Sequence, residues 1–264
     1  MISIKVIGIG PGGADQVTQA AVTALNKVDV FLVADKGGRK RDLVAARQEI
    51  CDRWITGDHR FVEVPDPVRG PDAERDAAAY GQGVADWHRA RTERYRAIIE
   101  ADPRLTYGFL VWGDPAFYDS TLRIVDALAV ELPITCDVIP GISAIQLLAA
   151  RHRVPLNRVG QPFLITTGRR LLEDFRAGLD VVVMLDGHLA CRELTGRDLE
   201  ICWGAYLGDA REVLVRGPLD EVIAELITTR ADLRQLHGWV MDTYLLRPLS
   251  ATPTHSSRSP STSR

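Results

Sequence analysis

A glycine-rich turn near the start of the chain is the first feature that could bind a ligand. Four glycines between positions 8 and 13 follow the β-branched run Ile2–Ile7, and this order predicts a strand, a tight turn and a helix. The spacing Gly8-x-Gly10-x-x-Gly13 matches a dinucleotide fingerprint, in which glycines let the backbone approach a pyrophosphate. Pro11, however, removes an N–H group that such a ligand would need. A ligand-lining turn and a purely structural turn therefore both stay open.

A second candidate site is Gly113–Tyr118, which directly follows the apolar run Thr106–Trp112. Open parallel sheets bind ligands beyond the carboxyl ends of their strands, so this position favours a functional turn. Asp114 could accept hydrogen bonds from the amine or hydroxyl groups of a ligand, while Phe117 and Tyr118 offer flat apolar surfaces. The alternative is that Asp114 and the proline after it only form a turn.

The segment Pro140–Ala144 repeats this arrangement after the next apolar run, Ile134–Ile139. Ser143 could cap the helix that follows, and the free backbone N–H groups at the start of that helix could face a ligand. The two roles are compatible. The segment is not a nucleophile elbow, because it lacks the second glycine of the G-x-S-x-G motif. This weakens a serine-hydrolase interpretation.

A cluster of four cations occupies Lys36–Arg41, after the apolar run Val28–Val33 and Asp35. Most such runs are solvated surface, but this one follows a predicted strand end, where it could attract a polyanionic ligand. The whole chain is slightly acidic, with 32 Lys and Arg against 35 Asp and Glu. This balance argues against a protein built around the phosphate backbone of nucleic acids.

The elements that carry these turns predict an α/β fold in two domains, for which 264 residues with 46% hydrophobic content suffice. Alternation of apolar runs with helical patterns indicates a mainly parallel five-stranded sheet over residues 1–139. Residues 140–250 should hold a mixed sheet, because the runs Ile201–Leu207 and Glu212–Val215 are too close for a crossover. Residues 251–264 are mostly Ser, Thr and Pro and predict a flexible tail.

Cysteine and histidine spacing gives no sign of a metal site or of a disulfide framework. The four cysteines are scattered without a C-x-x-C pair, and none of the six histidines has metal-ligand spacing. The N-terminus lacks a signal-peptide pattern, and the strongest apolar run, Val181–Leu185, is far shorter than the roughly 20 residues that cross a bilayer. We therefore expect a protein of the reducing cytoplasm, without a metal or a membrane span.

Taken together and in this order, the motifs resemble those of the tetrapyrrole (uroporphyrinogen and precorrin) methyltransferase family. They are the glycine turn, Gly113–Tyr118, Pro140–Ala144 and Thr166–Arg169, and the match spans about residues 2–247. Gly8-x-Gly10-x-Gly12 is also the spacing of a common methyltransferase loop. The resemblance implies two α/β domains that hold S-adenosylmethionine in the cleft between them, with S-adenosylhomocysteine as product, and usually a homodimer.

The same resemblance assigns site residues. The expected cofactor contacts are Gly113, Asp114, Phe117, Ser143, Ala144, Met184, Leu185, Ala205, Tyr206 and Leu207. The expected substrate contacts are Gly10, Pro11, Gly12, Lys36, Arg41, Arg47 and Tyr118. The substrate would be a precorrin, a tetrapyrrole with several carboxylates, and the cations of this second set would meet them with charge-assisted hydrogen bonds.

Within the family, the segment around Asp35 and Arg47 and the long predicted helix at 73–101 are most similar to the enzymes of aerobic cobalamin synthesis that methylate C1 of precorrin-5 and release acetate. Methyl transfer requires alignment and the exclusion of water, whereas loss of the acetyl group needs activated water, for which Asp35 would be the base. Three alternatives stay open: methylation of another precorrin position, an NAD(P)-dependent oxidoreductase that uses the glycine turn, and a tetrapyrrole carrier without activity.

Overall fold

The computed structural model describes residues 1–35, 41–67 and 77–249, which form two compact units. The first unit comprises Met1–Leu147 together with Tyr206–Glu212, and the second comprises Leu148–Ala205 and the chain from Val213 onward. This division differs from the expected boundary after residue 139. The difference arises because Pro140–Leu147 and the loop at 206–212 pack against the first sheet, as described below. The predicted tail at 251–264 lies outside the described residues.

The first unit contains the predicted five-stranded parallel sheet, and helices cover both of its faces. Its strands pair in the order β3-β2-β4-β1-β5, and all of these pairings are parallel. The strands are β1 (Ile2–Gly8), β2 (Val30–Asp35), β3 (Arg60–Pro65), β4 (Thr106–Val111) and β5 (Ile134–Ile139). Order and register place the turns that follow β1, β4 and β5 side by side at one edge of the sheet.

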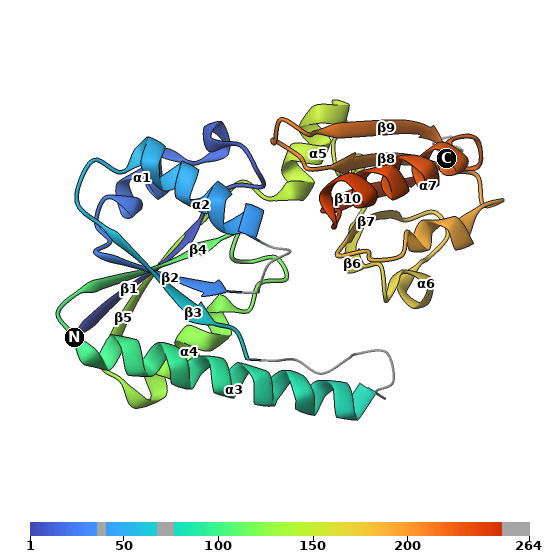
Figure 1. The fold of residues 1–264 in the computed structure, drawn as a ribbon. Coiled ribbons are helices and arrows are strands. Elements are labelled where there is room, and N and C mark those ends of the chain that lie inside the picture. Colours follow the sequence, from blue (N-terminus) through green and yellow to red (C-terminus); the bar gives the residue numbers. More distant parts are fainter. Residues whose placement is uncertain (36–40, 68–76, 250–264) are drawn as a thin grey trace, which may run out of the picture. The chain divides into compact units, whose positions relative to one another are not determined.

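Helices α1 and α2 cover one face of this sheet, and α3 and α4 cover the other (Figure 1). The bounds are η1 (Ala14–Gln16), α1 (Gln19–Leu25), α2 (Arg41–Trp54), α3 (Ala77–Ala101) and α4 (Thr121–Glu131). Alternate residues of β1 serve two cores. Ile4 and Val6 pack with Ile99 of α3, whereas Ile7 packs with Leu25 of α1. A strand buried on both faces explains the continuous apolar run at the N-terminus.

The second unit holds the predicted mixed sheet, with strand order β6-β7-β10-β8-β9. Its strands are β6 (Phe163–Thr167), β7 (Asp180–Met184), β8 (Leu199–Ala205), β9 (Val213–Pro218) and β10 (Asp242–Pro248). β6 and β7 are parallel, and the other pairings are antiparallel, including the short connection from β8 to β9. The remaining elements are α5 (Ala144–His152), α6 (Leu171–Asp174), η3 (Ala190–Leu194) and α7 (Leu219–His237).

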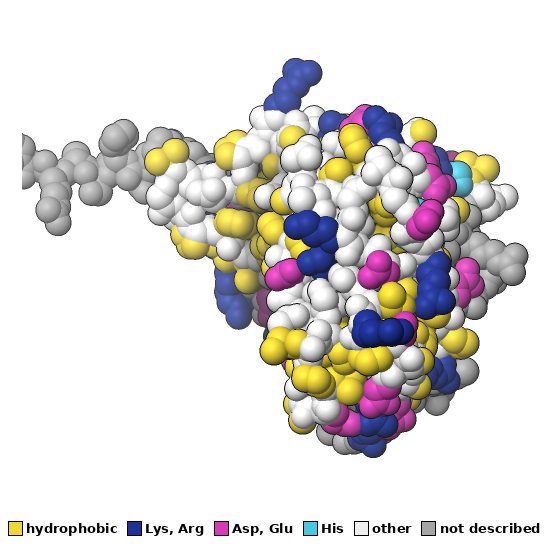
Figure 2. Space-filling view, turned by 90° about the vertical axis from the view of Figure 1, so that its left-hand side faces the viewer, with side chains coloured by type: hydrophobic (Ala, Val, Ile, Leu, Met, Phe, Trp, Pro, Cys, Tyr) yellow, Lys and Arg dark blue, Asp and Glu magenta, His cyan; other side chains and the backbone are white. Residues whose placement is uncertain are grey.

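The molecular surface carries charges of both signs. On the face drawn in Figure 2, Lys and Arg side chains are interspersed with Asp and Glu side chains and with apolar side chains, so that face gathers no single-sign patch. Within the part of the chain that the structure describes, no helix combines the length and the hydropathy that a membrane span requires.

Candidate functional site

Two of the predicted ligand turns are hydrogen-bonded to each other. Gly10 N donates to Gly113 O (3.2 Å) and Gly113 N donates to Gly10 O (2.8 Å), which forms an isolated antiparallel bridge beyond the ends of β1 and β4. Both glycines have left-handed backbones, with φ of 81° and 71°. Glycine adopts this conformation without a steric penalty, and this explains why both positions carry it.

Asp114 links this pair of turns to the third. Its Oδ2 accepts a hydrogen bond from Gly141 N (2.8 Å), and its Oδ1 accepts one from Ala116 N (2.8 Å). The sequence left two roles open for Asp114, namely to form a turn and to contact a ligand. The carboxylate forms the turn and also holds the segment Pro140–Ala144 against it. We therefore assign Asp114 first to the architecture of the loop cluster formed by residues 8–13, 113–118, 140–144 and 206–212.

The glycines of this loop cluster make room for neighbouring backbone. A Cβ atom on Gly8 would lie 2.5 Å from Gly141 N, and one on Gly141 would lie 2.1 Å from Gly113 O. A Cβ on Gly12 would lie 2.6 Å from Leu207 O, and one on Gly13 would lie 2.5 Å from the carbonyl oxygen of the next residue along that loop. In a dinucleotide fingerprint the second glycine, here Gly10, faces the pyrophosphate, and a Cβ atom on Gly10 would lie 2.8 Å from Gln16 O, so the chain itself fills the space beside this glycine. This geometry speaks against the oxidoreductase alternative.

The start of α5 is capped, but not by the Ser143 hydroxyl that the sequence suggested. Gln146 Oε1 accepts a hydrogen bond from Ser143 N (2.8 Å), and Ser143 O accepts one from Gln146 N (3.1 Å). The spacing Ser-x-x-Gln is that of a capping box and was the signal that the sequence interpretation missed. Ser143 Oγ is buried and has no protein partner among the described residues. Ala144 begins the helix directly after it.

Left-handed backbones also occur at predicted contact residues that are not glycine. Six such residues occur in the described part of the chain, and three of them, Tyr118, Leu185 and Tyr206, were predicted contacts. Their φ values are 51°, 52° and 49°. Side chains with a Cβ adopt this conformation at an energetic cost, and such residues cluster at ligand sites. Tyr118 is 47% exposed and is the member of this group that lies in the turn after β4.

Tyr206 and Leu207 are buried in the first unit rather than placed on a strand. The predicted strand at 201–207 ends at Ala205, because Tyr206 turns into the left-handed region. The guanidinium of Arg211 lies 4.8 Å from the centroid of the Tyr206 ring. Both predicted residues are less than 5% exposed.

Arg47 supplies a cation near the carboxyl end of β4. Its Nε donates to Leu110 O (3.3 Å), and its guanidinium lies 5.7 Å from the centroid of the Trp112 ring. Burial lowers the pKa of Arg47, and the nearby Asp119 carboxylate opposes this effect. A desolvated guanidinium gains from an anionic partner more than a solvated one does. Arg47 thus places a half-buried cation near the carboxyl end of β4.

The other predicted substrate and catalytic residues are only partly described. Lys36 lies outside the described residues, as do the side chains of Asp35 and Arg41. The backbone of Asp35 ends β2 and is in register with Pro65 of β3. Pro11 is buried beside the bridged glycines. Within the described residues, no group of three or more His, Cys, Asp or Glu side chains is placed to hold a metal ion.

Three predicted cofactor contacts belong to the second unit. Met184 ends β7, Leu185 follows it with 65% exposure, and Ala205 ends β8. In the first unit, the loop cluster brings together Gly10, Gly12, Gly113, Asp114, Ser143 and Leu207. The fold and this site define a class: a protein of two α/β units with a set of closely packed glycine turns at the carboxyl edge of its parallel sheet.

Comparison with known proteins identifies the class. A family model described as Tetrapyrrole (Corrin/Porphyrin) Methylases matches residues 3–223. A precorrin-6A synthase (deacetylating) of Sinorhizobium sp is 44% identical over 253 residues, which cover 94% of this chain and 95% of that protein. The chain belongs to the tetrapyrrole methylase family.

Solved structures agree with this assignment. A cobalamin synthesis related protein (CobF) from Corynebacterium diphtheriae has a TM-score of 0.81 and 36% identity, and the match covers 95% of this chain and 100% of that one. A uroporphyrin-III C-methyltransferase from Thermus thermophilus, complexed with S-adenyl homocysteine, shares the fold with a TM-score of 0.55 and 18% identity, over 93% of this chain and 92% of that one.

Proposed function

We propose that this chain is a precorrin-6A synthase of the deacetylating type, which methylates precorrin-5 at C1 with S-adenosylmethionine and releases acetate. The observation that carries the proposal is the 44% identity to a relative of that name over nearly the whole of both chains. The loop cluster supports it, because its turns meet at the edge of the sheet where α/β proteins bind ligands.

The loop cluster fits a cofactor that needs hydrogen bonds and an open backbone edge. A Cβ atom on Gly113 would have no neighbour nearer than 3.7 Å, so its left-handed backbone has room beside it. The Ser143 hydroxyl is a buried polar atom without a protein partner among the described residues, and a ligand atom would satisfy it. Residues Gly113, Phe117, Ser143 and Ala144 of the first unit would hold S-adenosylmethionine, and the family resemblance adds Met184 and Leu185 as expected contacts. When bound, this cofactor supplies an electrophilic methyl group.

The chain's own contribution to methyl transfer is alignment and exclusion of water. Tyr118 presents an exposed aromatic ring from a left-handed backbone beyond β4, and such a ring would stack on a face of the macrocycle. Arg47, together with Lys36 and Arg41, would pair with carboxylates at the rim of the substrate. Binding of the substrate should therefore weaken as the salt concentration rises.

Release of acetate requires water to attack an acyl carbon, and we assign the base to Asp35. Its backbone ends β2 in register with Pro65 of β3, at the carboxyl edge of the parallel sheet that also carries the loop cluster. A positioned carboxylate base typically contributes ~10²- to 10⁴-fold. Asp35→Asn should therefore slow the release of acetate more than it slows the transfer of the methyl group.

The proposal also includes the cellular compartment and the oligomeric state. All four cysteines are free thiols, which is compatible with the reducing cytoplasm. The family resemblance implies a homodimer, and light scattering of the purified chain would test this assembly.

The decisive experiment is turnover of precorrin-5 with methyl-labelled S-adenosylmethionine, followed by mass spectrometry of the product. The proposal predicts one labelled methyl group on C1, loss of the acetyl carbons from the macrocycle and an equal amount of acetate. A labelled methyl group at another carbon would favour the alternative precorrin specificity. Binding of the macrocycle without incorporation of label would favour the carrier.

Ser143→Ala tests the cofactor site by itself. Because the hydroxyl has no protein partner, its removal should leave the unfolding free energy unchanged within about 0.5 kcal/mol, while the affinity for S-adenosylhomocysteine falls about threefold to tenfold. Thr18→Ala is the matched control, because the Thr18 hydroxyl caps α1 by accepting from Ala21 N (3.1 Å). This control should lose about 1 kcal/mol of stability and no affinity.

A further inference from the structure

The loop after β7 holds an exposed apolar side chain in a strained conformation. Leu185 is 65% exposed with φ of 52°, and Leu189, at the other end of the loop, has φ of 56°. An isolated loop would relax from such backbones, since the left-handed region is unfavourable for a side chain with a Cβ. Contacts from the surrounding structure must therefore hold the loop Leu185–Leu189 in place.

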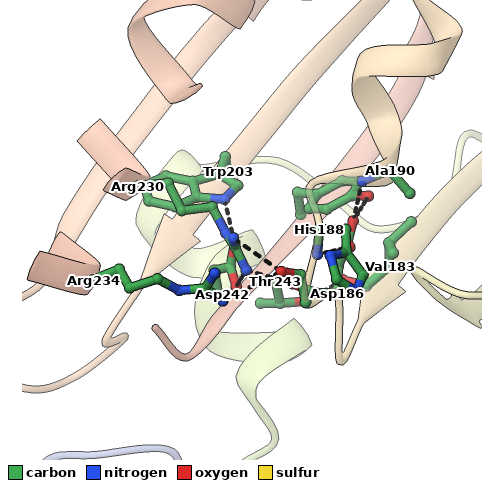
Figure 3. A network of polar contacts seen from close by, with 11 residues as sticks. Val183, Asp186, His188, Ala190, Trp203, Arg230, Arg234, Asp242 and Thr243 are labelled. Carbon is green, nitrogen blue, oxygen red and sulfur yellow. Dashed lines mark hydrogen bonds and ion pairs between the residues drawn. The ribbon is translucent and has the colours of Figure 1, made fainter. Parts of the chain in front are cut away.

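A buried carboxylate inside the loop provides the first of these contacts. Asp186 is 4% exposed, and its Oδ1 accepts from His188 N (2.9 Å) while its Oδ2 accepts from Ala190 N (2.6 Å; Figure 3). The same Oδ2 accepts from Tyr244 Oη of β10 (2.6 Å). Gly168 makes room for this carboxylate, because a Cβ atom there would lie 2.3 Å from Asp186 Cγ. The side chain therefore closes the loop on itself and ties it to β10.

An arginine from α7 provides the second set of contacts. Arg230 Nη2 donates to Asp186 O (2.6 Å) and its Nη1 donates to Gly187 O (3.2 Å), so one guanidinium holds two successive carbonyl groups. Its Nε donates to Asp242 Oδ2 (2.9 Å), and both side chains of this ion pair are almost fully buried. Trp203 Nε1 donates to the same Oδ2 (3.0 Å; Figure 3). The hydrogen bond from Trp203 of β8 therefore holds Asp242 in place, and the ion pair with Asp242 holds Arg230.

We infer that Arg230, supported by Asp242, and Tyr244 are positioning residues that preorganise Leu185 for the bound methyl donor. The inference rests on the proposed function, in which Leu185 contacts that cofactor. The geometry supports it in two ways. Backbone carbonyls, backbone amides and the one carboxylate of the loop are all hydrogen-bonded. A strained backbone that is held by so many contacts is typical of a functional site. The leucine at its start nevertheless stays exposed, so the apolar surface that the network orients is available to a ligand.

The energetic effect follows from the population of the ordered loop. When only a fraction of the molecules holds Leu185 in its binding orientation, the apparent affinity falls by that fraction. If loss of the Arg230 guanidinium reduces the ordered population to about a tenth, the affinity for the cofactor falls about tenfold, and the KM for S-adenosylmethionine rises while kcat changes less.

The other end of the second sheet offers a matched control. Arg247 Nε donates to Asp180 Oδ2 (3.2 Å), and its Nη2 donates to Pro155 O (2.8 Å). It is thus another largely buried arginine that holds a buried carboxylate and a loop carbonyl. Asp180 begins β7, whereas the loop that carries Leu185 follows its end. Loss of Arg247 should therefore cost stability without disturbing Leu185.

The test compares the full-length chain with its Arg230→Met, Arg247→Met and Leu185→Gly variants by thermal unfolding and by calorimetric titration with S-adenosylhomocysteine. Both arginine variants should melt at lower temperature, but only Arg230→Met should bind about tenfold more weakly. Leu185→Gly relieves the left-handed strain, so it should melt no lower than the wild type and still bind about fivefold to tenfold more weakly.

Equal affinities of Arg230→Met and Arg247→Met would overturn the inference, as would a Leu185→Gly variant that binds like the wild type. If Arg230→Met does not fold, Tyr244→Phe replaces it, since it removes the hydrogen bond from Tyr244 Oη to Asp186 and should raise the KM for S-adenosylmethionine with little change in kcat. If the wild type itself does not bind S-adenosylhomocysteine, the proposed function fails. If the wild type binds and its variants bind equally well, only the present inference fails.

Discussion

Replacement of Gly141 by alanine tests whether the loop cluster depends on backbone contact between its turns. The new Cβ would lie 2.1 Å from Gly113 O and 2.8 Å from the carbonyl carbon of Gly8. Both neighbours are backbone atoms, so the turns must separate by roughly 1 Å to restore van der Waals distance. Overpacking of this kind costs about 1–3 kcal/mol, and the hydrogen bond from Gly141 N to Asp114 contributes about 1 kcal/mol more. We expect a total loss of about 2–4 kcal/mol.

Urea denaturation followed by circular dichroism measures this loss. With a slope of about 2 kcal/mol per molar urea, the midpoint should fall by about 1–2 M, and the affinity for S-adenosylhomocysteine should fall with it. Gly57→Ala is the control, because an added Cβ there meets nothing within 4 Å and the residue does not have a left-handed backbone. A Gly141→Ala variant that unfolds and binds like Gly57→Ala would refute the argument that the turns are packed through glycine.

Four further substitutions test single side chains. Asp114→Ala leaves two backbone amides without their acceptor and should cost about 1–3 kcal/mol; full stability in urea together with unchanged ligand affinity would contradict its bridging role. The Lys5 ammonium lowers the pKa of Asp137, so this pair stabilises the fold above about pH 4 and less as the pH falls through the lowered pKa; since Asp137 is largely exposed, Asp137→Asn should destabilise the fold slightly at pH 7 and less at acidic pH, and a pH-independent difference would refute the assignment. Burial raises the pKa of Cys191 to about 12 and Cys136 is exposed, so in a thiol-reagent assay at pH 8 the fast phase should disappear in Cys136→Ser and persist in Cys191→Ser.

The glycine turn shows how one motif supports two functions until the chain is folded. Its letters match a dinucleotide fingerprint, and nothing in their spacing separates a turn that faces a pyrophosphate from one that faces protein. The contacts of Gly8 with Gly141 and of Gly12 with Leu207 separate the two. They join residues more than 100 positions apart in the chain, and for that reason local sequence does not contain them.

The sequence by itself determined the two sheets, the parallel pairing of the first and the placement of the candidate turns at strand ends. Apolar periodicity is a local property, and the short connection between β8 and β9 excluded a crossover by its length alone. The family also followed from the ordered motifs, because Gly113–Tyr118 and Pro140–Ala144 lie at fixed places relative to their strands.

Only the tertiary structure decided which groups meet. The strand order places β4 and β5 on either side of β1, and this order brings Asp114 to Gly141. The loop at 206–212 belongs to the first unit and lies against Gly12 and Gly13. The left-handed backbone of Leu185 and the buried Arg230–Asp242 pair that holds its loop have no sequence signature. Such features depend on buried polar groups that form hydrogen bonds with residues far away in the sequence. The free energy of these contacts is not encoded in the spacing of residues along the chain.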